Sequence, residues 1–262
     1  MDLGLKGKRA LVMGASKGLG RSIADALAAD GVAVAVSGRE QASLDKVAAA
    51  LIAAGAPKAV GITADVSKVE DMDRLADAAI AALGGVDILV LNHGGPPPCT
   101  ALEMKESDLI LWFQSIVVSP IHIAMRLLPA MRAQKFGRII TVGSSGMEQP
   151  IPNLALSNTL RAAIVGWNKT LANEVAVDGV TCNILAPGAI VTDRTRQTSS
   201  GQAQREGKSV EQVMEERGKT IPAGRYGLTD EYGPMGAFLA SERAGYITGS
   251  IIRVDGGMVR HV

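Results

Sequence analysis

The chain has 262 residues, enough for one large domain or two small ones, and 47% of them are hydrophobic. That apolar content can fill a complete core, so the composition excludes an intrinsically disordered protein. The 27 lysines and arginines nearly balance the 26 aspartates and glutamates, which leaves a formal net charge of +1. A chain with this charge balance lacks the dense positive surface that neutralises the phosphates of a nucleic acid. We therefore expect no binding to nucleic acid.

The cysteines indicate a reducing compartment. Cys99 and Cys182 are too few for a disulfide scaffold, and neither they nor the three histidines show metal-ligand spacing, so no metal site is expected. The first residues contain no apolar segment typical of a secretory signal, which predicts a cytoplasmic protein. The uncharged stretch 109–125 contains Gln114 and His122 and falls short of the roughly 20 apolar residues of a membrane span. We expect a helix buried against the core and another subunit, not a membrane segment.

Seven short runs rich in β-branched residues alternate with longer segments in which apolar residues recur at helical spacing. Gly31, Gly55 and Gly84 follow three of the helical segments, where a left-handed cap residue is common. Repeated alternation of apolar strands with helices predicts a doubly wound α/β fold, with a parallel sheet covered on both faces. No linker or internal repeat divides the chain. The strand candidates span residues 10–12, 32–36, 59–62, 86–91, 138–142, 180–185 and 251–254.

One segment departs from this alternation. Residues 192–220 are polar and charged, although they lie between two strand candidates where a compact crossover is expected. A solvated helical excursion and a mobile lid over a site at the strand ends both fit this composition. The sequence leaves the two interpretations open.

A glycine-rich turn follows the first strand candidate. It reads Gly14-Ala15-Ser16-Lys17-Gly18-Leu19-Gly20 and leads into a helix that we expect to begin near Arg21. Such a turn lets backbone N–H groups approach a pyrophosphate at the positive end of a helix, where larger side chains would obstruct it. Three glycines can also serve only to close a tight turn. Because a strand precedes this turn and a helix follows it, the turn predicts a dinucleotide cofactor.

The end of the second strand candidate indicates which dinucleotide is bound. In such folds a carboxylate at this point accepts from the ribose 2′-hydroxyl, whereas a basic group accommodates a 2′-phosphate. Here the sequence reads Ser37-Gly38-Arg39, with no acid before Glu40. Arg39, together with Lys17 in the glycine turn, favours NADP(H) over NAD(H), although an arginine at a strand end can also be merely solvated.

Further motifs follow the later strand candidates in a fixed order. They are Asp65-Val66, Asn92-His93-Gly94-Gly95, Pro187-Gly188, and Tyr246-Ile247-Thr248-Gly249 before Val254-Asp255-Gly256-Gly257. With the glycine turn, they resemble the short-chain dehydrogenase/reductase family over essentially the whole chain, and most of all its 3-oxoacyl-carrier-protein reductases. The resemblance implies a Rossmann-like doubly wound parallel sheet of seven strands, in a single domain over residues 1–262.

The resemblance also implies where the cofactor is held. Around its phosphates we expect the residues of the glycine turn, at its adenine and ribose the residues that end the third and fourth strands, and at its nicotinamide those that follow the sixth. The implied contacts at the phosphates are Gly14, Ser16, Lys17, Gly18, Leu19 and Gly20. Those at the adenine are Asp65 and Val66, those near the ribose are Asn92 and Gly94, and those at the nicotinamide are Pro187, Gly188, Ile190 and Thr192.

The proton relay of the family is altered in this chain. The family uses a serine after the fifth strand, a Tyr-x-x-x-Lys pair thirteen residues later and an asparagine on the preceding helix. Ser144 stands at the serine position, but thirteen residues on stands Ser157, and four further stands Arg161. Ile116 stands at the asparagine position, and residues 162–169 fit the family's helix without a gap. Three of the four relay positions have therefore changed.

This change removes the usual acid. A serine hydroxyl is a far poorer acid than a phenol, and a guanidinium with a pKa above about 12 does not release its proton. The loss of a positioned general acid costs roughly 10²–10⁴-fold in rate. We expect Ser144 and Ser157 to donate hydrogen bonds to a carbonyl oxygen, and Arg161 to stabilise developing negative charge or to hold the nicotinamide ribose.

Other proton donors are scarce in the sequence. Tyr226, Tyr232 and Tyr246 all lie in the C-terminal segment, where we expect them to pack rather than to act in catalysis. His93 follows the fourth strand candidate and is either a substitute acid or a structural loop residue. His122, in the uncharged stretch, is expected in the core or at an interface.

Three functions remain open. The first is an NADP(H)-dependent oxidoreductase that interconverts a carbonyl and a secondary alcohol at an atypical Ser144, Ser157 and Arg161 site. The second is a non-catalytic NADP(H)-binding sensor or assembly protein. The third is a halohydrin dehalogenase, a class similar in fold that uses serine, tyrosine and arginine, but Ser157 is not a tyrosine and those enzymes lose the glycine turn. The uncharged helices at 109–131 and 152–177 predict a homo-oligomer, and the resemblance implies a homotetramer.

Overall fold

The seven predicted strands are all present and form one parallel sheet within residues 2–261, the part of the chain that the computed structural model describes. Their order across the sheet is β3-β2-β1-β4-β5-β6-β7. Leu11 in the centre lies opposite Ala35 on one neighbouring strand and Leu89 on the other. The bounds are β1 Arg9–Val12, β2 Ala33–Gly38, β3 Ala59–Thr63, β4 Ile88–Leu91, β5 Gly137–Val142, β6 Val180–Pro187 and β7 Ile251–Val254.

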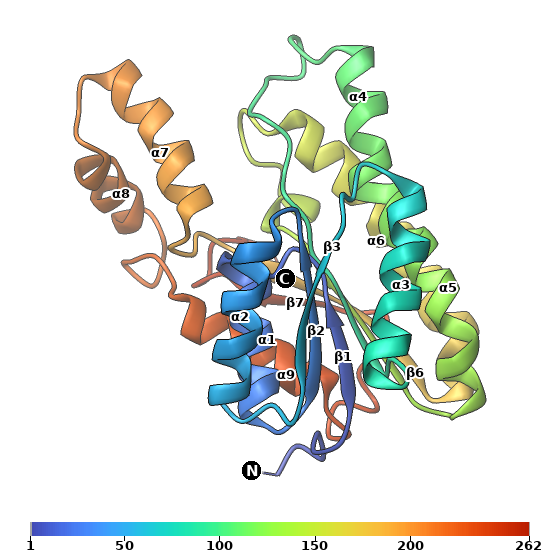
Figure 1. Ribbon diagram of the computed structural model, residues 1–262. Coiled ribbons are helices and arrows are strands. Elements are labelled where there is room, and N and C mark those ends of the chain that lie inside the picture. Colours follow the sequence, from blue (N-terminus) through green and yellow to red (C-terminus); the bar gives the residue numbers. More distant parts are fainter. Residues whose placement is uncertain (1, 262) are drawn as a thin grey trace.

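Helices cover both faces of this sheet, with α1, α2 and α9 on one side and α3, α5 and α6 on the other (Figure 1). Gly31, Gly55 and Gly84 have positive φ angles of 75°, 122° and 77° where their helices end, as predicted. The bounds are α1 Gly18–Ala29, α2 Gln41–Ala53, α3 Val69–Leu83, α4 Glu106–Phe113, η1 Gln114–Val118, α5 Ser119–Ala133, η2 Ser145–Met147, α6 Ala155–Val175, η3 Ala176–Asp178, α7 Asp193–Glu206, α8 Val210–Lys219 and α9 Thr229–Ala240.

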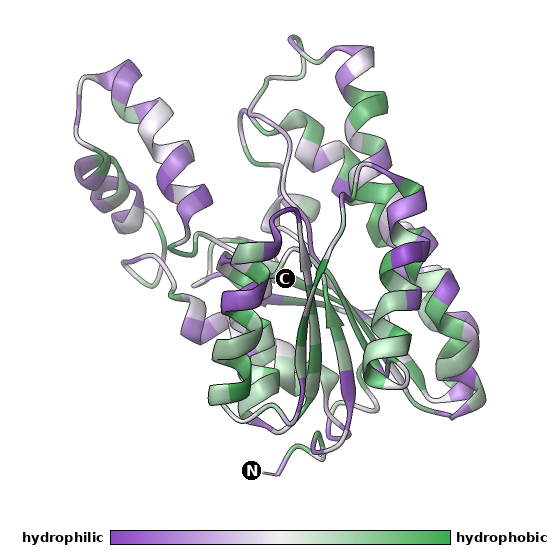
Figure 2. Ribbon diagram, in the orientation of Figure 1, coloured by the Kyte–Doolittle hydropathy of each residue, from purple (hydrophilic) through white to green (hydrophobic). Residues whose placement is uncertain are grey.

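Two hydrophobic cores lie on the two faces of the sheet, because successive strand residues point to opposite sides. In β1, Ala10 and Val12 pack in the core under α1, α2 and α9, whereas Leu11 packs in the core under α3, α5 and α6. Figure 2 shows this distribution, with apolar residues along the strands and polar ones concentrated on α7 and α8. The predicted Rossmann-like, doubly wound fold is confirmed.

The strand order reverses direction at β1 and β4, which lie side by side in the centre. In such sheets the crevice outside the carboxyl ends of these two strands is the ligand site. The turn after β1 enters this crevice, and α1 begins at Gly18, three residues before the predicted start at Arg21. The earlier start places the helix N-terminus within the glycine turn itself.

The segment that broke the strand and helix alternation is itself helical. Thr192 and Ser209 cap α7 and α8, and each accepts a hydrogen bond from the backbone N–H three residues on. Both helices stand beyond the carboxyl ends of the strands, and α4 stands beyond the same end on the other side (Figure 1). These two projections flank the crevice.

The continuous helical stretch Glu106–Ala133, which comprises α4, η1 and α5, is unusually apolar. It is 28 residues long with a mean hydropathy of 1.5 over 18 residues, so by length and composition alone it could cross a membrane. The helix is longer than the uncharged stretch 109–125, because it continues past residue 125 through Arg126 and Arg132. In this structure the stretch packs against α3, α6 and β5. Only 39% of those 18 residues are buried in the structure, which leaves one face of the helix uncovered.

Candidate active site

The glycine turn is shaped by close contact with the end of β4. A Cβ on Gly14, whose φ is +55°, would lie 2.8 Å from Asn92 Nδ2, and one on Gly20 would lie 2.5 Å from the same atom. Asn92 Nδ2 donates to the carbonyls of Met13 and Gly14, at 3.2 and 2.9 Å. No side chain caps the N-terminus of α1. The turn therefore leaves backbone N–H groups and space for an anion at the positive end of a helix.

The two basic residues predicted to favour the 2′-phosphate of NADP(H), Arg39 and Lys17, differ in the contacts that they make. Arg39 is exposed, and among residues 2–261 no hydrogen bond or ion pair engages its guanidinium. Lys17 Nζ instead contacts Asp193 Oδ2 at 2.9 Å, between side chains that are 71% and 69% exposed. This ion pair joins the glycine turn to the first residue of α7. Arg39 is thus free for a ligand, whereas Lys17 is already engaged.

The predicted adenine and nicotinamide contacts also lie at the strand carboxyl ends. After β3, Asp65 Oδ1 accepts from the backbone N–H and the hydroxyl of Ser67, at 2.9 and 2.8 Å, and these bonds lower the pKa of Asp65. After β6, a Cβ on Gly188 would lie 2.6 Å from Asp255 Cα, so only glycine fits. The side chain of Thr192 lies beside Gly18. The ends of β1 and β6 therefore meet across the crevice. Of the other implied contacts, Leu19 lies in the first turn of α1 and Pro187 ends β6. The connections that follow the strands contain Ser16, Val66, Gly94 and Ile190.

The three predicted catalytic residues lie at the end of β5. Arg161 on α6 is 9% exposed, and its Nη1 donates to the carbonyl of Val142 at 2.9 Å, while its Nε donates to Ser157 Oγ at 3.3 Å. Ser144 follows Val142 by two residues and accepts from the Gly146 N–H at 3.1 Å. In the described chain no acceptor engages the hydroxyl protons of Ser144 or Ser157. Two hydroxyl donors and a guanidinium thus gather at one strand end.

The charges at this strand end are fixed around neutral pH. Burial, reinforced by Arg194, lowers the pKa of Arg161 to about 10, so the guanidinium stays charged. Burial and the Arg161 charge lower the pKa of His93 to about 3, so its imidazole is neutral. His93 Nδ1 lies 2.7 Å from the Gly94 carbonyl oxygen. These shifts favour the structural interpretation of His93 over that of a substitute acid.

The three tyrosines differ in burial, because two are buried and one is exposed. Tyr232 is buried and donates to the Leu185 carbonyl at 2.9 Å, and burial raises the pKa of its phenol. Tyr226 is also buried, so both pack as predicted. The predicted packing of Tyr246 is wrong, because that side chain is fully exposed.

The helix that carries the family's asparagine has an apolar residue at that position. Ile116 is 1% exposed and packs with Val117, Leu160 and Ile164 beneath α6. It lies in η1, a π-helical turn, an irregularity that is often found at functional sites. His122 does not lie in the core, because its side chain is 37% exposed and contacts Asp73 at 2.9 Å, so of the two predicted positions the interface stays a prediction.

Sequence reasoning missed three polar residues that shape the crevice. Asp193 holds Lys17, and Arg194 Nη2 donates to the Pro96 carbonyl at 2.7 Å, which joins α7 to the loop after β4. Asn158 Nδ2 donates to the Ile151 carbonyl at 2.9 Å and fixes the loop before α6. The partners of Asp193 and Arg194 are distant in the sequence, so only the helix-capping Thr192 before them was a usable signal.

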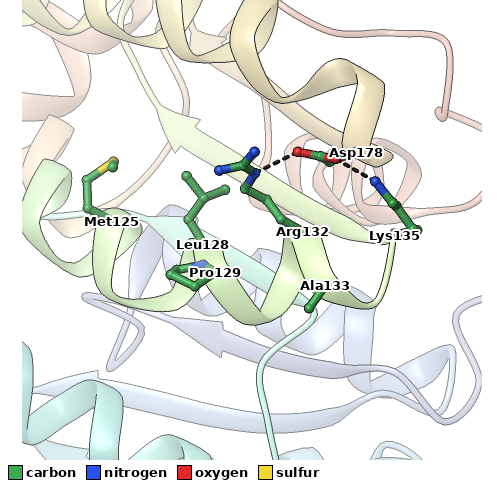
Figure 3. Close-up of a pocket in the computed structure, with 7 residues that line it drawn as sticks. All are labelled: Met125, Leu128, Pro129, Arg132, Ala133, Lys135 and Asp178. Atoms are coloured by element: carbon green, nitrogen blue, oxygen red, sulfur yellow. Dashed lines mark hydrogen bonds and ion pairs between the residues drawn. The ribbon is translucent and has the colours of Figure 1, made fainter.

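Two surface hollows lie away from this crevice. The first, of about 480 Å³, is at the opposite end of the sheet, where Arg132 and Lys135 both contact Asp178 at 2.6 and 2.5 Å and so join α5 to η3 (Figure 3). The second, of about 530 Å³, lies on the uncovered face of η1 and α5 and is lined by Phe113 and Met125 among others. Within residues 2–261 no group of three or more metal-binding side chains occurs.

Comparisons with known proteins agree with this architecture. The family described as enoyl-(acyl carrier protein) reductase matches residues 14–259. The chain is 34% identical over 259 residues to 3-oxoacyl-[acyl-carrier-protein] reductase FabG of Haemophilus influenzae, with 97% of this chain and 99% of that protein covered. It is 34% identical over 249 residues to the reductase MabA of Mycobacterium tuberculosis, with 95% and 91% covered.

Solved structures show the same likeness. L-sorbose reductase from Gluconobacter frateurii, complexed with NADPH and L-sorbose, superposes with a TM-score of 0.95 at 30% identity over all of both chains. YwfH, an NADPH-dependent reductase involved in bacilysin biosynthesis, superposes with a TM-score of 0.91 at 28% identity, over 97% of this chain and 99% of that one. This chain therefore belongs to the short-chain dehydrogenase/reductase family and is similar within it to the 3-oxoacyl-carrier-protein reductases.

Proposed function

We propose that this protein is an NADP(H)-dependent oxidoreductase that interconverts a carbonyl and a secondary alcohol. The observation that carries the proposal is the meeting, at one edge of the sheet, of a glycine cradle with the Ser144, Ser157 and Arg161 cluster. The same activity is supported by a similar structure complexed with NADPH, by a similar structure of an NADPH-dependent reductase and by relatives named as reductases.

The residues of the crevice fit a phosphorylated dinucleotide. Gly14 and Gly20 have no room for side chains, so the cofactor's pyrophosphate would lie against backbone N–H groups at the start of α1. Arg39, exposed and unengaged within residues 2–261, would hold the 2′-phosphate. Thr192 and Gly188 would border the nicotinamide. When bound, NADPH supplies the hydride.

The chain's own residues would polarise the carbonyl without giving up a proton. Ser144 and Ser157 donate hydrogen bonds to the carbonyl oxygen, and the charged Arg161 stabilises the negative charge that develops there. None of these groups is an acid near neutral pH, so water provides the proton. The missing acid costs roughly 10²–10⁴-fold in rate, or about 3–5 kcal/mol of barrier, relative to a site with a phenol.

A second candidate function is a non-catalytic NADP(H) sensor or assembly protein. The observation that favours it is the lack of a nearby donor that titrates around neutrality, since His93 is neutral and the Tyr232 hydroxyl is engaged with a backbone carbonyl. Such a protein would keep the cofactor cradle and have no use for Ser157 and Arg161.

An NADPH titration combined with an NADPH-oxidation screen over carbonyl compounds distinguishes the two functions. We expect Ser144→Ala, Ser157→Ala and Arg161→Ala each to lower turnover about tenfold or more, with NADPH affinity changed little. Thr170→Ala, which removes an exposed hydroxyl from the same helix as Ser157, is the matched control. A wild type with no turnover and alanine variants that match it would support the non-catalytic function.

We also propose a homotetramer. Ile110, Leu111, Phe113 and Met125 are 65%, 58%, 43% and 48% exposed and form an apolar face on α4, η1 and α5 that a single chain does not cover. A second copy is the occupant that we propose, because α4 and η1 also contact α6, the other helix that the sequence predicts to take part in assembly. Exposed apolar faces of this kind mark association surfaces.

We propose further that residues 192–220 are a lid and that the protein acts in the cytoplasm. Helix α7 contacts the crevice through Lys17 to Asp193 and through Arg194 to the Pro96 carbonyl, and α8 packs on α7. A lid would open by breaking these two contacts. Free thiols at Cys99 and Cys182 fit a reducing compartment.

A further inference from the structure

Among residues 2–261, Arg161 is a buried cation without an anionic partner. It is 9% exposed, and its pKa is shifted by burial, by the Tyr232 phenol and by the Arg194 charge, with no carboxylate among these causes. Arginine is almost never this buried unless it is paired. A charge taken out of water and left uncompensated is strongly destabilising, so such a group is expected to have a partner that binds from outside.

The hydrogen bonds of Arg161 leave one edge of the guanidinium open. Nε donates to Ser157 Oγ at 3.3 Å and Nη1 donates to the Val142 carbonyl at 2.9 Å, and both acceptors are neutral. Nη2 has no acceptor within residues 2–261. A planar guanidinium with free N–H groups matches a carboxylate in shape as well as in charge.

The surroundings reinforce the positive field. Arg194 reaches toward the crevice from α7 and is close enough to Arg161 to lower the pKa of Arg161. His93 is neutral and adds no charge. The reacting end of the cofactor supplies no anion either, because a nicotinamide ring is neutral when reduced and positive when oxidised. The nicotinamide ribose is neutral as well, and the negative charge on the reacting oxygen exists only during hydride transfer, so a permanent anionic partner for Arg161 would come from the substrate.

We propose that the substrate is an oxo acid or hydroxy acid, and that Arg161 binds its carboxylate while Ser144 and Ser157 hold the reacting oxygen. Arg161 Nε donates a hydrogen bond to Ser157 Oγ, so the two side chains are adjacent. A reacting oxygen held by Ser157 and a carboxylate held by Arg161 must therefore lie within a few covalent bonds of each other in the substrate. This spacing favours 2-oxo and 3-oxo acids over carbonyl compounds with a distant acid group. The proposal rests on the proposed function for hydride transfer and adds the chemical class of the substrate.

Binding tests the substrate class separately from turnover. Protein saturated with NADP⁺ is titrated by calorimetry with 2-oxobutanoate and 3-oxobutanoate, and with the methyl ester of each acid as the uncharged control. We expect each acid to bind at least tenfold more tightly than its ester. We expect Arg161→Gln to abolish that ratio and Arg161→Lys, which keeps the charge without the planar fork, to retain part of it.

Several outcomes overturn the proposal. They are esters that bind as tightly as the acids, an acid preference that survives Arg161→Gln, and no acid binding at millimolar concentration. NADPH affinity shows that each variant is folded, and Arg161→Lys decides the matter if Arg161→Gln does not fold. NADPH oxidation with the same four probes then tests the proposed function, since acid binding without turnover of these or other carbonyl compounds contradicts the oxidoreductase and leaves the anion site standing.

Discussion

Single residues decide which cofactor this protein binds. Arg39 stands where an acid would select NAD(H), and within residues 2–261 its guanidinium has no partner to give up on binding. Arg39→Asp removes a charged hydrogen bond worth about 1.5–3 kcal/mol and adds a like charge, so NADPH affinity should fall tenfold or more and the preference should reverse toward NADH. A fluorescence titration with both cofactors measures the change.

The exposed Lys46 on the neighbouring helix α2 provides a matched control for this charge reversal. Lys46→Asp changes the net charge equally but lies away from the strand end, so the NADPH to NADH ratio should stay near that of the wild type. Equal loss of NADPH affinity in both variants would mean that Arg39 acts through the general field rather than through a phosphate contact.

The pH profile reports whether His93 acts as an acid. With a pKa lowered to about 3, His93 is neutral throughout the neutral range, and Arg161, with a pKa of about 10, stays charged. We therefore expect kcat/KM for carbonyl reduction to be flat between about pH 5.5 and 8.5, without the step near 6.5 that an imidazolium donor produces. A step that disappears in His93→Gln would contradict this assignment.

Restoring the family's pair tests what the substitutions at Ser157 and Arg161 removed. Ser157→Tyr with Arg161→Lys supplies a phenol and an ammonium that lowers its pKa, so reduction of neutral ketones should rise by up to about 10²-fold. Either single change should do much less, because a phenol without the ammonium, or the reverse, is not an activated acid. A double variant that binds NADPH and gains nothing would show that the crevice does not admit a ketone beside the nicotinamide.

At the scale of secondary-structure elements, α7 is joined to the cofactor site by one exposed ion pair. Asp193 holds Lys17 at 2.9 Å, and its carboxylate would repel a phosphate there. An exposed pair contributes little because solvent and salt screen it, so Asp193→Asn should tighten NADPH binding by no more than about fivefold, and less at high salt. Glu206→Gln, at the far end of the same helix, is the control. Weaker NADPH binding in Asp193→Asn would instead mean that the pair helps to order the bound state.

The sequence predicts these elements unevenly, for physical reasons. Periodicity and glycine caps are local signals, so the seven strands and the glycine turn were predictable. The pair between Lys17 and Asp193 joins residues 176 positions apart, and no local pattern records it. The π-helical turn at Ile116 and the unpaired state of Arg161 depend on how α5 and α6 pack, which a single sequence does not reveal.

For the whole molecule, the two projections from the sheet have opposite characters. Helices α7 and α8 are largely polar, whereas α4 contains many apolar residues (Figure 2). The side chains of Ile110, Leu111 and Phe113 on α4 are exposed to water. Each Å² of apolar surface removed from water stabilises by roughly 25 cal/mol, so a second copy on this face would gain considerably. Because α4 and α6 pack together, the same contact would stabilise the helix that carries Ser157 and Arg161.

Assembly and activity should therefore be lost together when this face is made polar. Ile110 and Phe113 are three residues apart on one side of α4, so Ile110→Glu with Phe113→Glu places two charges in the middle of the proposed contact. We expect light scattering to report a tetramer for the wild type and smaller species for this variant, with reduced turnover. Ile52→Glu, at a side chain on α2 that is 53% exposed and lies outside both predicted contact helices, should leave the mass unchanged. A wild type that is monomeric at micromolar concentration would contradict the assembly, and would leave the apolar face of α4 without an occupant.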